Sequence, residues 1–416
     1  MTTASIITIG DELLIGQVTD TNSAWMAQEL NKAGIWLKRR VAVGDNREDI
    51  RRALDEESEA ADIILITGGL GPTADDITKP LLCEYFHTRL LINEEALKNV
   101  RHIFESVLKR PVTERNLKQA EVPEACTVIQ NKRGTAPGML FEREGRIFVS
   151  MPGVPHEMKG MMTDEVIPFL LKKFKMPFIA HRTILTAGVG ESALADHIQA
   201  FESALPVNIR LAYLPGYGMV RLRLTAIGND AAGTGAEINT RFSQLKELLQ
   251  EWMVTDEDIS LQEAVGRLLK SRGQTVATAE SCTGGYAAHL ITSIPGSSAY
   301  FVGGLIPYQN DIKEKVLQVQ GKTLSSAGAV SEETVREMIS GALHLFGSDY
   351  ALATSGIMGP DGGTATKPVG TVWIAAGNRS KIETRLLHFR FDRQRNIELT
   401  ATNVLNLLRK FILSTP

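Results

Sequence analysis

Apolar runs that end abruptly at glycine mark the first part of the chain. Ser5–Ile9 stops at Gly10, and the continuous apolar run Asp62–Thr67 breaks into a glycine-rich stretch. Between these runs, Asn22–Ala33 carries apolar residues at helical spacing, and Ile147–Met151 is a further apolar run. Continuous apolar strands interleaved with helices are typical of a parallel sheet covered on both faces. The pattern predicts an α/β domain over residues 1–172.

A second pattern covers residues 176–256. In chain order it predicts a β-like run, a helix, an alternating strand, a loop and a second helix, at Arg182–Ala187, Glu191–Ala200, Val220–Ile227, Gly228–Gly235 and about Ala236–Trp252. The segment is short and gathers no cluster of catalytic residue types. We interpret it as a small α+β spacer or dimerisation domain.

The third segment, residues 258–416, again alternates helices with buried strands. Ser260 followed by Glu263 resembles a capping box that opens the helix Leu261–Arg272, and Gly273 is a natural stop for it. The expected strands and the last helix are Thr275–Ala279, Tyr350–Thr354, Val369–Ala376 and roughly Arg395–Phe411. This segment is also predicted to be α/β.

Composition narrows the class of protein. The chain has 416 residues, a formal net charge of -3 and three cysteines without metal-ligand spacing. This charge gives no general attraction to nucleic acid or to an acidic membrane, and neither partner is expected. An odd number of scattered cysteines favours a reducing compartment. With no signal peptide or membrane-length apolar run visible, the cytoplasm is the expected location.

Three clusters of polar and glycine residues in the third segment follow predicted strands. They are Glu280–Gly285, Tyr308–Lys313 and Ser355–Pro360, the last continuing to Thr371. Ser281 stands where a strand would turn sharply into a helix, which exposes the side chain and aims main-chain amides at a ligand. A serine hydroxyl needs a base, and no histidine lies in these clusters. Lys313 is the better candidate, because a lysine shielded from water loses pKa and can accept the proton.

Cys282 is a rival nucleophile beside Ser281. Neighbouring side chains on a turn point apart, so only one of the two can face the site. Taken singly, each of these clusters is more often ordinary turn chemistry. The functional interpretation depends on their occurring together at strand ends within one segment.

The first segment carries a different chemistry. Thr67–Thr73, with Gly68, Gly69 and Gly71, lets main-chain amides approach a phosphate closely. The acidic pair Asp75-Asp76 follows this loop, and Asp11-Glu12 follows the first strand. Carboxylates beside a phosphate loop suit a divalent cation that bridges to phosphate oxygens. Asp76 is preferred over Asp75, because one of the pair is expected to cap the following helix.

The third segment closely resembles the C-terminal domain of the CinA family, whose characterised members deamidate nicotinamide mononucleotide (NMN). The matching pieces include Ala279–Gly285, Gly303-Gly304, Ala329–Ser331 and Ser355–Val372. The resemblance implies that Ser281 attacks the carboxamide, that Lys313 is its base, and that Tyr308 and Ser355 support the site without a cofactor. Substrate-binding positions are expected among Thr283, Gly284, Gly285, Asn310, Gly356, Gly359, Thr364 and Lys367. The late arginine of the family corresponds to Arg393 or Arg395, which the sequence leaves open.

The first segment resembles the three-layer α/β/α molybdopterin-binding fold of the MoaB/MogA/MoeA group and, more closely, the N-terminal domain of CinA. The residues that carry this resemblance are Thr67–Thr73, Asp75-Asp76, Gly134–Gly138 and Met151–Met158. It implies an ADP-ribose pyrophosphatase that uses Mg²⁺ or a similar cation, with Gly68, Gly69, Gly71 and Thr73 on the substrate. Asp75, Asp76, Asp11 and Glu12 are the candidate metal ligands. A homodimer acting on NMN and ADP-ribose is expected.

Two other interpretations stay open at this stage. The first segment could hold a pterin or nucleotide without cleaving it, in a chain that serves as a competence or DNA-repair accessory protein. It could also transfer an adenylyl group to molybdopterin, because fold alone does not fix function.

Overall fold

Residues 2–73 and 76–415 of the chain are described by a computed structural model in which two units can be distinguished. Unit 1 consists of Met1–Ile179 with Ile227–Ala231, and unit 2 consists of Ala180–Ala226 with Ala232–Pro416. Asp75, one of the predicted metal ligands, lies outside the described residues.

The sheet of unit 1 has six strands in the order β2-β1-β3-β8-β7-β6. The four parallel strands are β1 (Thr3–Ile9), β2 (Trp36–Val43), β3 (Ile63–Thr67) and β8 (Arg146–Met151). The last two, β7 (Gly138–Arg143) and β6 (Thr127–Ile129), are antiparallel. β1 and β3 are almost wholly buried, as their continuous apolar sequences predict.

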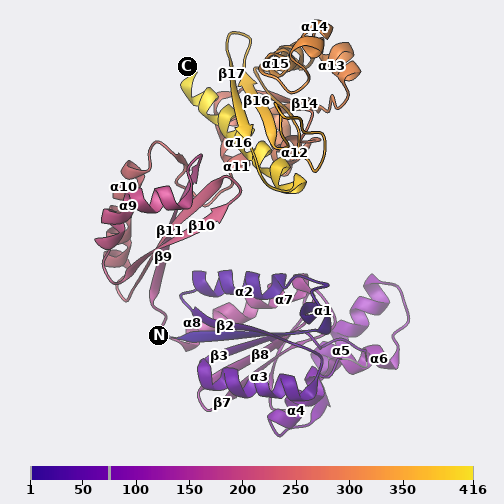
Figure 1. Ribbon diagram of the computed structural model, residues 1–416. Helices are drawn as coiled ribbons and strands as arrows, with labels where there is room; N and C mark the ends of the chain where they lie inside the picture. Colours follow the sequence, from indigo (N-terminus) through magenta and orange to yellow (C-terminus); the bar gives the residue numbers. More distant parts are fainter. Residues whose placement is uncertain (1, 74–75, 416) are drawn as a thin grey trace. The chain divides into compact units, whose positions relative to one another are not determined.

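Helices cover both faces of this sheet. One face packs on α2 (Thr21–Lys32), α7 (Pro155–Met161) and α8 (Ile167–Lys173), and the other on α3 (Arg47–Ala60) and α4 (Thr78–Tyr85) (Figure 1). The predicted three-layer α/β/α arrangement is confirmed. Shorter elements complete the unit: α1 (Asp11–Leu14), β4 (Leu90–Ile92), α5 (Glu94–Arg101), α6 (Glu114–Leu117) and β5 (Glu121–Pro123).

The first part of unit 2 has the chain order βαββαβ. Its elements are β9 (Phe178–Ala187), α9 (Glu191–Ser203), β10 (Ile209–Gly216), β11 (Met219–Gly228), α10 (Ala231–Leu248) and β12 (Met253–Thr255). The sheet order β10-β11-β9-β12 is that of a ferredoxin-like split βαβ unit. The predicted loop Gly228–Gly235 is wrong in its second half, because α10 begins at Ala231 and buries Thr234. Strand β10 was not predicted.

The second part of unit 2 is built on a five-stranded sheet in the order β14-β13-β15-β16-β17. The strands β13 (Val276–Glu280), β14 (Phe301–Leu305) and β15 (Tyr350–Gly356) are parallel. The strands β16 (Thr371–Gly377) and β17 (Ile382–His388) run antiparallel to their neighbours. The central strands β13 and β15 are buried along nearly their whole length.

Helices again pack on both faces of this sheet. One face is covered by α11 (Leu261–Arg272), α12 (Tyr286–Thr292) and α16 (Arg393–Ser414), and the other by α13 (Asn310–Leu317) and α15 (Glu332–Phe346), with α14 (Gly321–Ser326) between these two in the chain. The predicted ends of α11 are confirmed. The Ser260 hydroxyl accepts a bond from the Glu263 amide, and Gly273 ends the helix with a φ of 61°.

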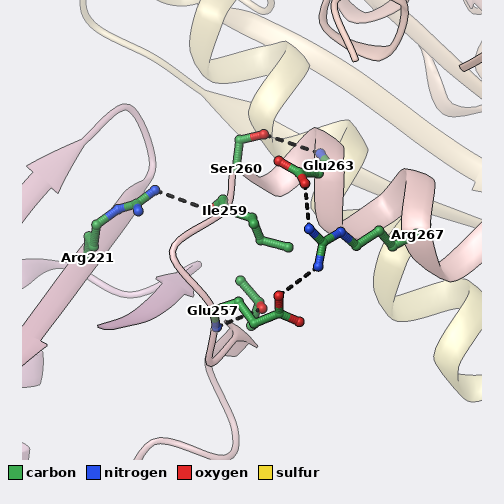
Figure 2. A network of polar contacts seen from close by, with 7 residues as sticks. Arg221, Glu257, Ile259, Ser260, Glu263 and Arg267 are labelled. Carbon is green, nitrogen blue, oxygen red and sulfur yellow. Dashed lines mark hydrogen bonds and ion pairs between the residues drawn. The ribbon is translucent and has the colours of Figure 1, made fainter. Parts of the chain in front are cut away.

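The two parts of unit 2 share a hydrophobic core. Leu185 of β9 is buried in the same cluster as residues of α11, α12 and α16, and Met219 and Val254 pack against that cluster. The connection between the parts is braced by polar contacts. Arg267 bonds Glu257 and Glu263, each at 2.7 Å, and Arg221 reaches the Ile259 carbonyl (Figure 2). No helix in the described part of the chain is long and apolar enough to cross a membrane.

Candidate functional site

The candidate residues of unit 2 gather at one edge of its sheet. Parallel strands β13, β14 and β15 point their carboxyl ends to this edge, and Ser281, Tyr308 and Ser355 lie at or just after those ends. Because β17 is antiparallel to β16, its end also leads back to this edge, just before Arg393. The carboxyl edge of an open α/β sheet is where ligands bind. The order and direction of the strands therefore bring together residues that are more than 100 positions apart in the sequence, such as Ser281 and Arg393.

Ser281 occupies the sharp turn between β13 and α12 that the sequence predicts. Its amide donates to the Thr354 carbonyl at 2.9 Å, which fixes the turn to the end of β15. Gly284 and Gly285 take φ values of 61° and 94°, a region that side-chain-bearing residues rarely adopt. These two glycines allow the chain to enter α12 directly after the serine.

A buried carboxylate, Glu280, fills the start of α12. It accepts bonds from the amides of Ala287 at 2.9 Å and Ala288 at 2.8 Å, and from the Thr283 hydroxyl at 2.7 Å. The expectation that amides of this helix face a ligand is therefore wrong for Ala287 and Ala288. Thr283 likewise takes part in an internal network, since its hydroxyl also bonds Thr354 at 2.7 Å. The main-chain amides of Cys282 and Thr283 are then the donors nearest to Ser281 in the sequence that can face a ligand.

Lys313 reaches Ser281 from the start of α13. Its Nζ lies 3.1 Å from the Ser281 Oγ, 2.8 Å from the Pro307 carbonyl and 3.3 Å from the Tyr308 carbonyl. The lysine is only 1% exposed and the serine 8%. Burial lowers the pKa of Lys313, and none of the three contacts is a carboxylate that would restore it. The sequence placed these two residues 32 positions apart, and the fold brings them within hydrogen-bond distance.

Cys282 is buried in the apolar core next to the serine turn. Its side chain belongs to the apolar core that α11, α12 and α16 form with the sheet. Burial raises the pKa of its thiol to about 12, so the reactive thiolate is scarce at neutral pH. The environment of Cys282 therefore disfavours it as a nucleophile.

The two late arginines have different surroundings. Arg393 donates to the Gly359 carbonyl at 2.8 Å and to the Tyr308 hydroxyl at 3.0 Å, which ties three candidate segments together. The Arg395 guanidinium instead lies over the rings of Phe391, at 4.0 Å, and Tyr217, at 5.7 Å. Of the two arginines that the sequence leaves open, Arg393 is therefore the one that bonds Tyr308.

Ser355 and Lys367 bind the main chain before α15. Ser355 donates to the Ala329 carbonyl at 2.6 Å, and the Lys367 ammonium donates to the carbonyls of Ala327 and Val330 at 2.7 and 2.8 Å. Thr364 accepts from the Lys367 amide. In this arrangement both side chains hold the segment 327–330. Gly356 ends β15, and Asn310 is the first residue of α13.

A cavity of about 430 Å³ lies at the carboxyl edge of the unit 1 sheet. It is lined by the ends of β1, β3 and β8 with the loops that follow them: Gly10, Glu12, Gly68, Gly69, Gly71, Asp76, Pro152, Gly153 and Glu157, among others. Gly68 has a φ of 115°, and a Cβ there would meet the Ile9 carbonyl at 2.2 Å. Only glycine allows the two strand ends to approach this closely.

The predicted metal ligands of unit 1 are placed unequally. Glu12 and Asp76 line the cavity, whereas the Asp11 carboxylate accepts from the Asp45 amide. Asp76 itself accepts from the amides of Gly71 and Thr73 at 2.7 and 2.8 Å, so it shapes the glycine loop. Within residues 2–73 and 76–415, no three acidic, histidine or cysteine side chains form a ready metal cluster. Two carboxylates fit Mg²⁺, which is commonly held by one or two carboxylates together with substrate phosphates.

Comparison with known families covers nearly all of the chain. Residues 5–172 match the model "Probable molybdopterin binding domain", residues 181–254 match "Damage-inducible protein CinA KH domain", and residues 258–412 match "CinA C-terminal domain". A CinA-like protein of Cytophaga hutchinsonii is 46% identical over 407 residues, which is 98% of this chain and 97% of that protein. The chain belongs to the CinA family.

A second relative matches over nearly the whole chain, and a solved structure matches part of it. A CinA-like protein of Flavobacterium psychrophilum is 43% identical over 411 residues, 99% of this chain and 98% of its own length. The crystal structure of a competence damage-inducible protein A from Klebsiella pneumoniae, 37% identical in sequence, covers 38% of this chain and 97% of its own, with a TM-score of 0.37.

The middle segment matches a KH family model but lacks the loop motif typical of KH domains. KH domains clamp nucleotides with a G-x-x-G loop, and residues 181–254 of this CinA-family chain contain no such spacing of glycines. The βαββαβ sheet described above is what the matched segment builds.

Proposed function

We propose that unit 2 of this CinA-family protein is an amide hydrolase that converts NMN to nicotinic acid mononucleotide and ammonia. The observation that carries the proposal is the Lys313 Nζ at 3.1 Å from the Ser281 Oγ, with both side chains almost fully buried. A serine next to a lysine of lowered pKa is a nucleophile next to its base. The substrate class comes from the family resemblance.

The contacts of Lys313 suit a neutral amine. Such an amine has two N–H donors and one lone pair. The carbonyls of Pro307 and Tyr308 accept the two N–H bonds. The third Nζ contact is a donation to the Ser281 Oγ at 3.1 Å; loss of one proton from the ammonium leaves a lone pair there, which accepts the proton of the Ser281 hydroxyl. Burial favours this form over the ammonium, because desolvation penalises the charge.

The reaction follows from this geometry in two stages. The Ser281 Oγ bonds to the carboxamide carbon while its proton passes to the Lys313 Nζ. The oxyanion would be met by the main-chain amides of the turn after Ser281. The carbon–nitrogen bond then breaks, and Lys313 returns the proton to the departing ammonia, which leaves an ester on Ser281. Water, deprotonated by Lys313, cleaves that ester and releases the carboxylate product.

The deciding experiment compares Ser281→Ala with Cys282→Ala in the full chain. We expect ammonia release from NMN to fall at least roughly a thousandfold in Ser281→Ala, because the covalent route is lost. Cys282→Ala should keep most of the activity, and circular dichroism checks that both variants fold. An active Ser281→Ala with an inactive Cys282→Ala would reject the assignment.

We further propose that unit 1 cleaves ADP-ribose to AMP and ribose 5-phosphate. The support is a cavity of about 430 Å³ with glycine-loop walls and four acidic residues in its lining, Glu12, Asp45, Asp76 and Glu157, of which Glu12 and Asp76 are the predicted metal ligands. A divalent cation bound by these carboxylates would neutralise the diphosphate and polarise its phosphorus–oxygen bonds. The residues themselves bind and orient: the glycine loop offers close main-chain approach, and Asp76 fixes the shape of that loop.

The alternative for unit 1 is a module that binds a nucleotide or pterin without cleaving it. Incubation with ADP-ribose and Mg²⁺, with products separated by chromatography, distinguishes the two. AMP and ribose 5-phosphate in equal amounts are expected. Saturable binding of ADP-ribose without products would replace hydrolysis by the binding role.

A further inference from the structure

The tip of the β10–β11 hairpin lies against α16, the helix whose first turn carries Arg393. The tip is Gly216-Tyr217-Gly218, and Gly218 takes a φ of 69°. A Cβ on Gly218 would stand 3.6 Å from side-chain atoms of Leu399, Thr402 and Asn403 on α16. The hairpin belongs to the middle segment of the chain, whereas α16 belongs to the segment that carries Ser281.

Tyr217 projects from this tip toward the first turn of α16. The Arg395 guanidinium lies 5.7 Å from the centre of the Tyr217 ring and 4.0 Å from that of Phe391. Tyr217 thus adjoins the first turn of α16.

The first turn of α16 connects Tyr217 with the site. Asp392 caps the helix by accepting from the Arg395 amide at 3.0 Å. Asn396, which is buried, donates to the carbonyls of Met358 and Phe391, each at 3.0 Å. Arg393, in the same turn, holds the Gly359 carbonyl and the Tyr308 hydroxyl. A restraint on Arg395 is therefore a restraint on the turn that orients Arg393.

We propose that Tyr217 is a positioning residue of the serine site, supplied by the middle segment of the chain. Its ring holds the Arg395 guanidinium, which steadies the first turn of α16 and keeps Arg393 directed at Tyr308 and Gly359. The consequence for catalysis rests on the proposed deamidase function. The segment interpreted from sequence as a spacer then contributes to substrate binding.

The expected size follows from the contact. A cation over an exposed aromatic ring corresponds to an effect of about two- to fivefold. Among the described residues, the side chains of Arg393 and Tyr308 make no hydrogen bond to Ser281 or Lys313, and Tyr308 meets Lys313 only through its main-chain carbonyl. The effect should therefore appear in KM and leave kcat nearly unchanged.

Tyr217 contributes little to the fold itself. Its side chain is 49% exposed, while the hairpin is anchored by Met219 and the neighbouring strand by Leu185 in the shared core. Removing the ring should thus leave the thermal transition of the protein almost unchanged. This separates a positioning role from a structural one.

The test uses the full chain with Tyr217→Ala, Tyr217→Phe and a control, Val207→Ala, at a residue that is 99% exposed before β10. We expect Tyr217→Ala to raise KM for NMN about two- to fivefold. Tyr217→Phe keeps the ring and should behave as the parent protein. Unchanged KM in Tyr217→Ala, or a joint fall of kcat and Tm, would overturn the proposal.

Hydrogen exchange supplies a readout that needs no substrate. The amides of Arg395 and Asn396 are bonded to Asp392 in the first turn of α16. They should exchange faster in Tyr217→Ala than in Tyr217→Phe or Val207→Ala. A parent protein inactive on NMN would reject the deamidase function, yet the exchange rates would still decide whether Tyr217 positions this turn. Equal exchange in all variants would overturn that role.

Discussion

The serine site and the cavity of unit 1 are both built at the carboxyl edge of a largely parallel sheet, yet they differ in how much is in place without a ligand. In unit 2, Ser281 and Lys313 are enclosed and already 3.1 Å apart. In unit 1, the glycine loop around Gly71 and Thr73 is exposed, and one of its carboxylates, Asp76, is engaged with the loop itself.

In the two functions that we propose, this difference corresponds to two ways of activating a bond. A lysine becomes a base only where water is excluded, so the serine site has to be dry before substrate arrives. A diphosphate that approaches acidic residues needs a cation to neutralise both, so an open and hydrated cavity is suitable there. The same sheet edge thus supports either strategy, and the side chains that follow the strands decide which.

The strongest test of this contrast is Lys313→Arg, which keeps a cation but removes the base. Arginine does not give up its proton at accessible pH, so kcat for NMN should fall about a hundred- to ten-thousandfold, nearly as far as in Lys313→Ala. Steady-state ammonia release measures the effect. Lys315→Arg is the matched control, since Lys315 lies on the same helix with an exposed side chain. Substantial turnover by Lys313→Arg would assign Lys313 to substrate binding instead.

Chelation separates the two sites. EDTA should lower ADP-ribose cleavage roughly a hundredfold or more and leave NMN deamidation unchanged, because in our proposal only the unit 1 chemistry uses a cation. Glu12→Gln should act like the chelator on ADP-ribose alone. Asp76→Asn should do the same, with some added loss from weaker bonds to the amides of Gly71 and Thr73.

The matched control for these carboxylates is Glu56→Gln, an exposed acidic residue on α3. Equal loss of both activities on chelation would refute the division of labour between the units. Cleavage of ADP-ribose that survives EDTA would remove the cation from the mechanism.

The pH dependence of the serine site has a definite sign. Burial lowers the pKa of Lys313 below its ordinary 10.5, and the base form is the deprotonated one. kcat/KM for NMN should therefore rise about tenfold per pH unit below that lowered pKa and level off above it. Folded Lys313 binds fewer protons than unfolded Lys313 between the two pKa values, so unfolding free energy should rise with pH there. A flat profile up to pH 10 would contradict the role of Lys313.

The smallest effect on the serine site is expected from removing the rest of the chain. A fragment of residues 258–416 retains Ser281, Lys313 and Arg393, so its kcat should stay within about twofold of the parent value. It also exposes the apolar surface that Leu185, Met219 and Val254 cover. Loss of that burial should lower its Tm by roughly 5–10 °C. An inactive fragment that remains folded would mean that the site depends on the missing residues for more than binding.

Much of this architecture is predictable from local patterns. Glycines after apolar strands marked both sheet edges, and Ser260 with Gly273 marked the ends of α11. The pairing of Ser281 with Lys313 was inferred from the lack of a histidine in the three clusters, and the family resemblance implies the same pair; the burial and carbonyl contacts of Lys313 give it a physical basis. The sequence could not decide between Arg393 and Arg395. The two residues lie in one helical turn, and they differ only in the neighbours that the tertiary fold gives them.

Tyr217 was missed for a related reason. Its strand, β10, alternates weakly and ends in exposed residues, so the hairpin and its contact with the predicted last helix, α16, could not be anticipated. Glu280 was likewise seen only as part of a turn. Its role in bonding the first amides of α12 depends on burial that a sequence pattern does not report.

The core shared by the last two segments has a consequence for how a protease would meet this protein. Three family models match the chain, but the second and third segments share one hydrophobic core, to which Leu185 of the second segment belongs. The last turn of α8 and the residues after it carry the exposed Lys172, Lys173 and Lys175, whereas the 255–260 connection is braced by Arg221 and Arg267. Brief trypsin digestion should thus release two pieces, not three, and the piece that keeps Ser281 should also keep its hairpin.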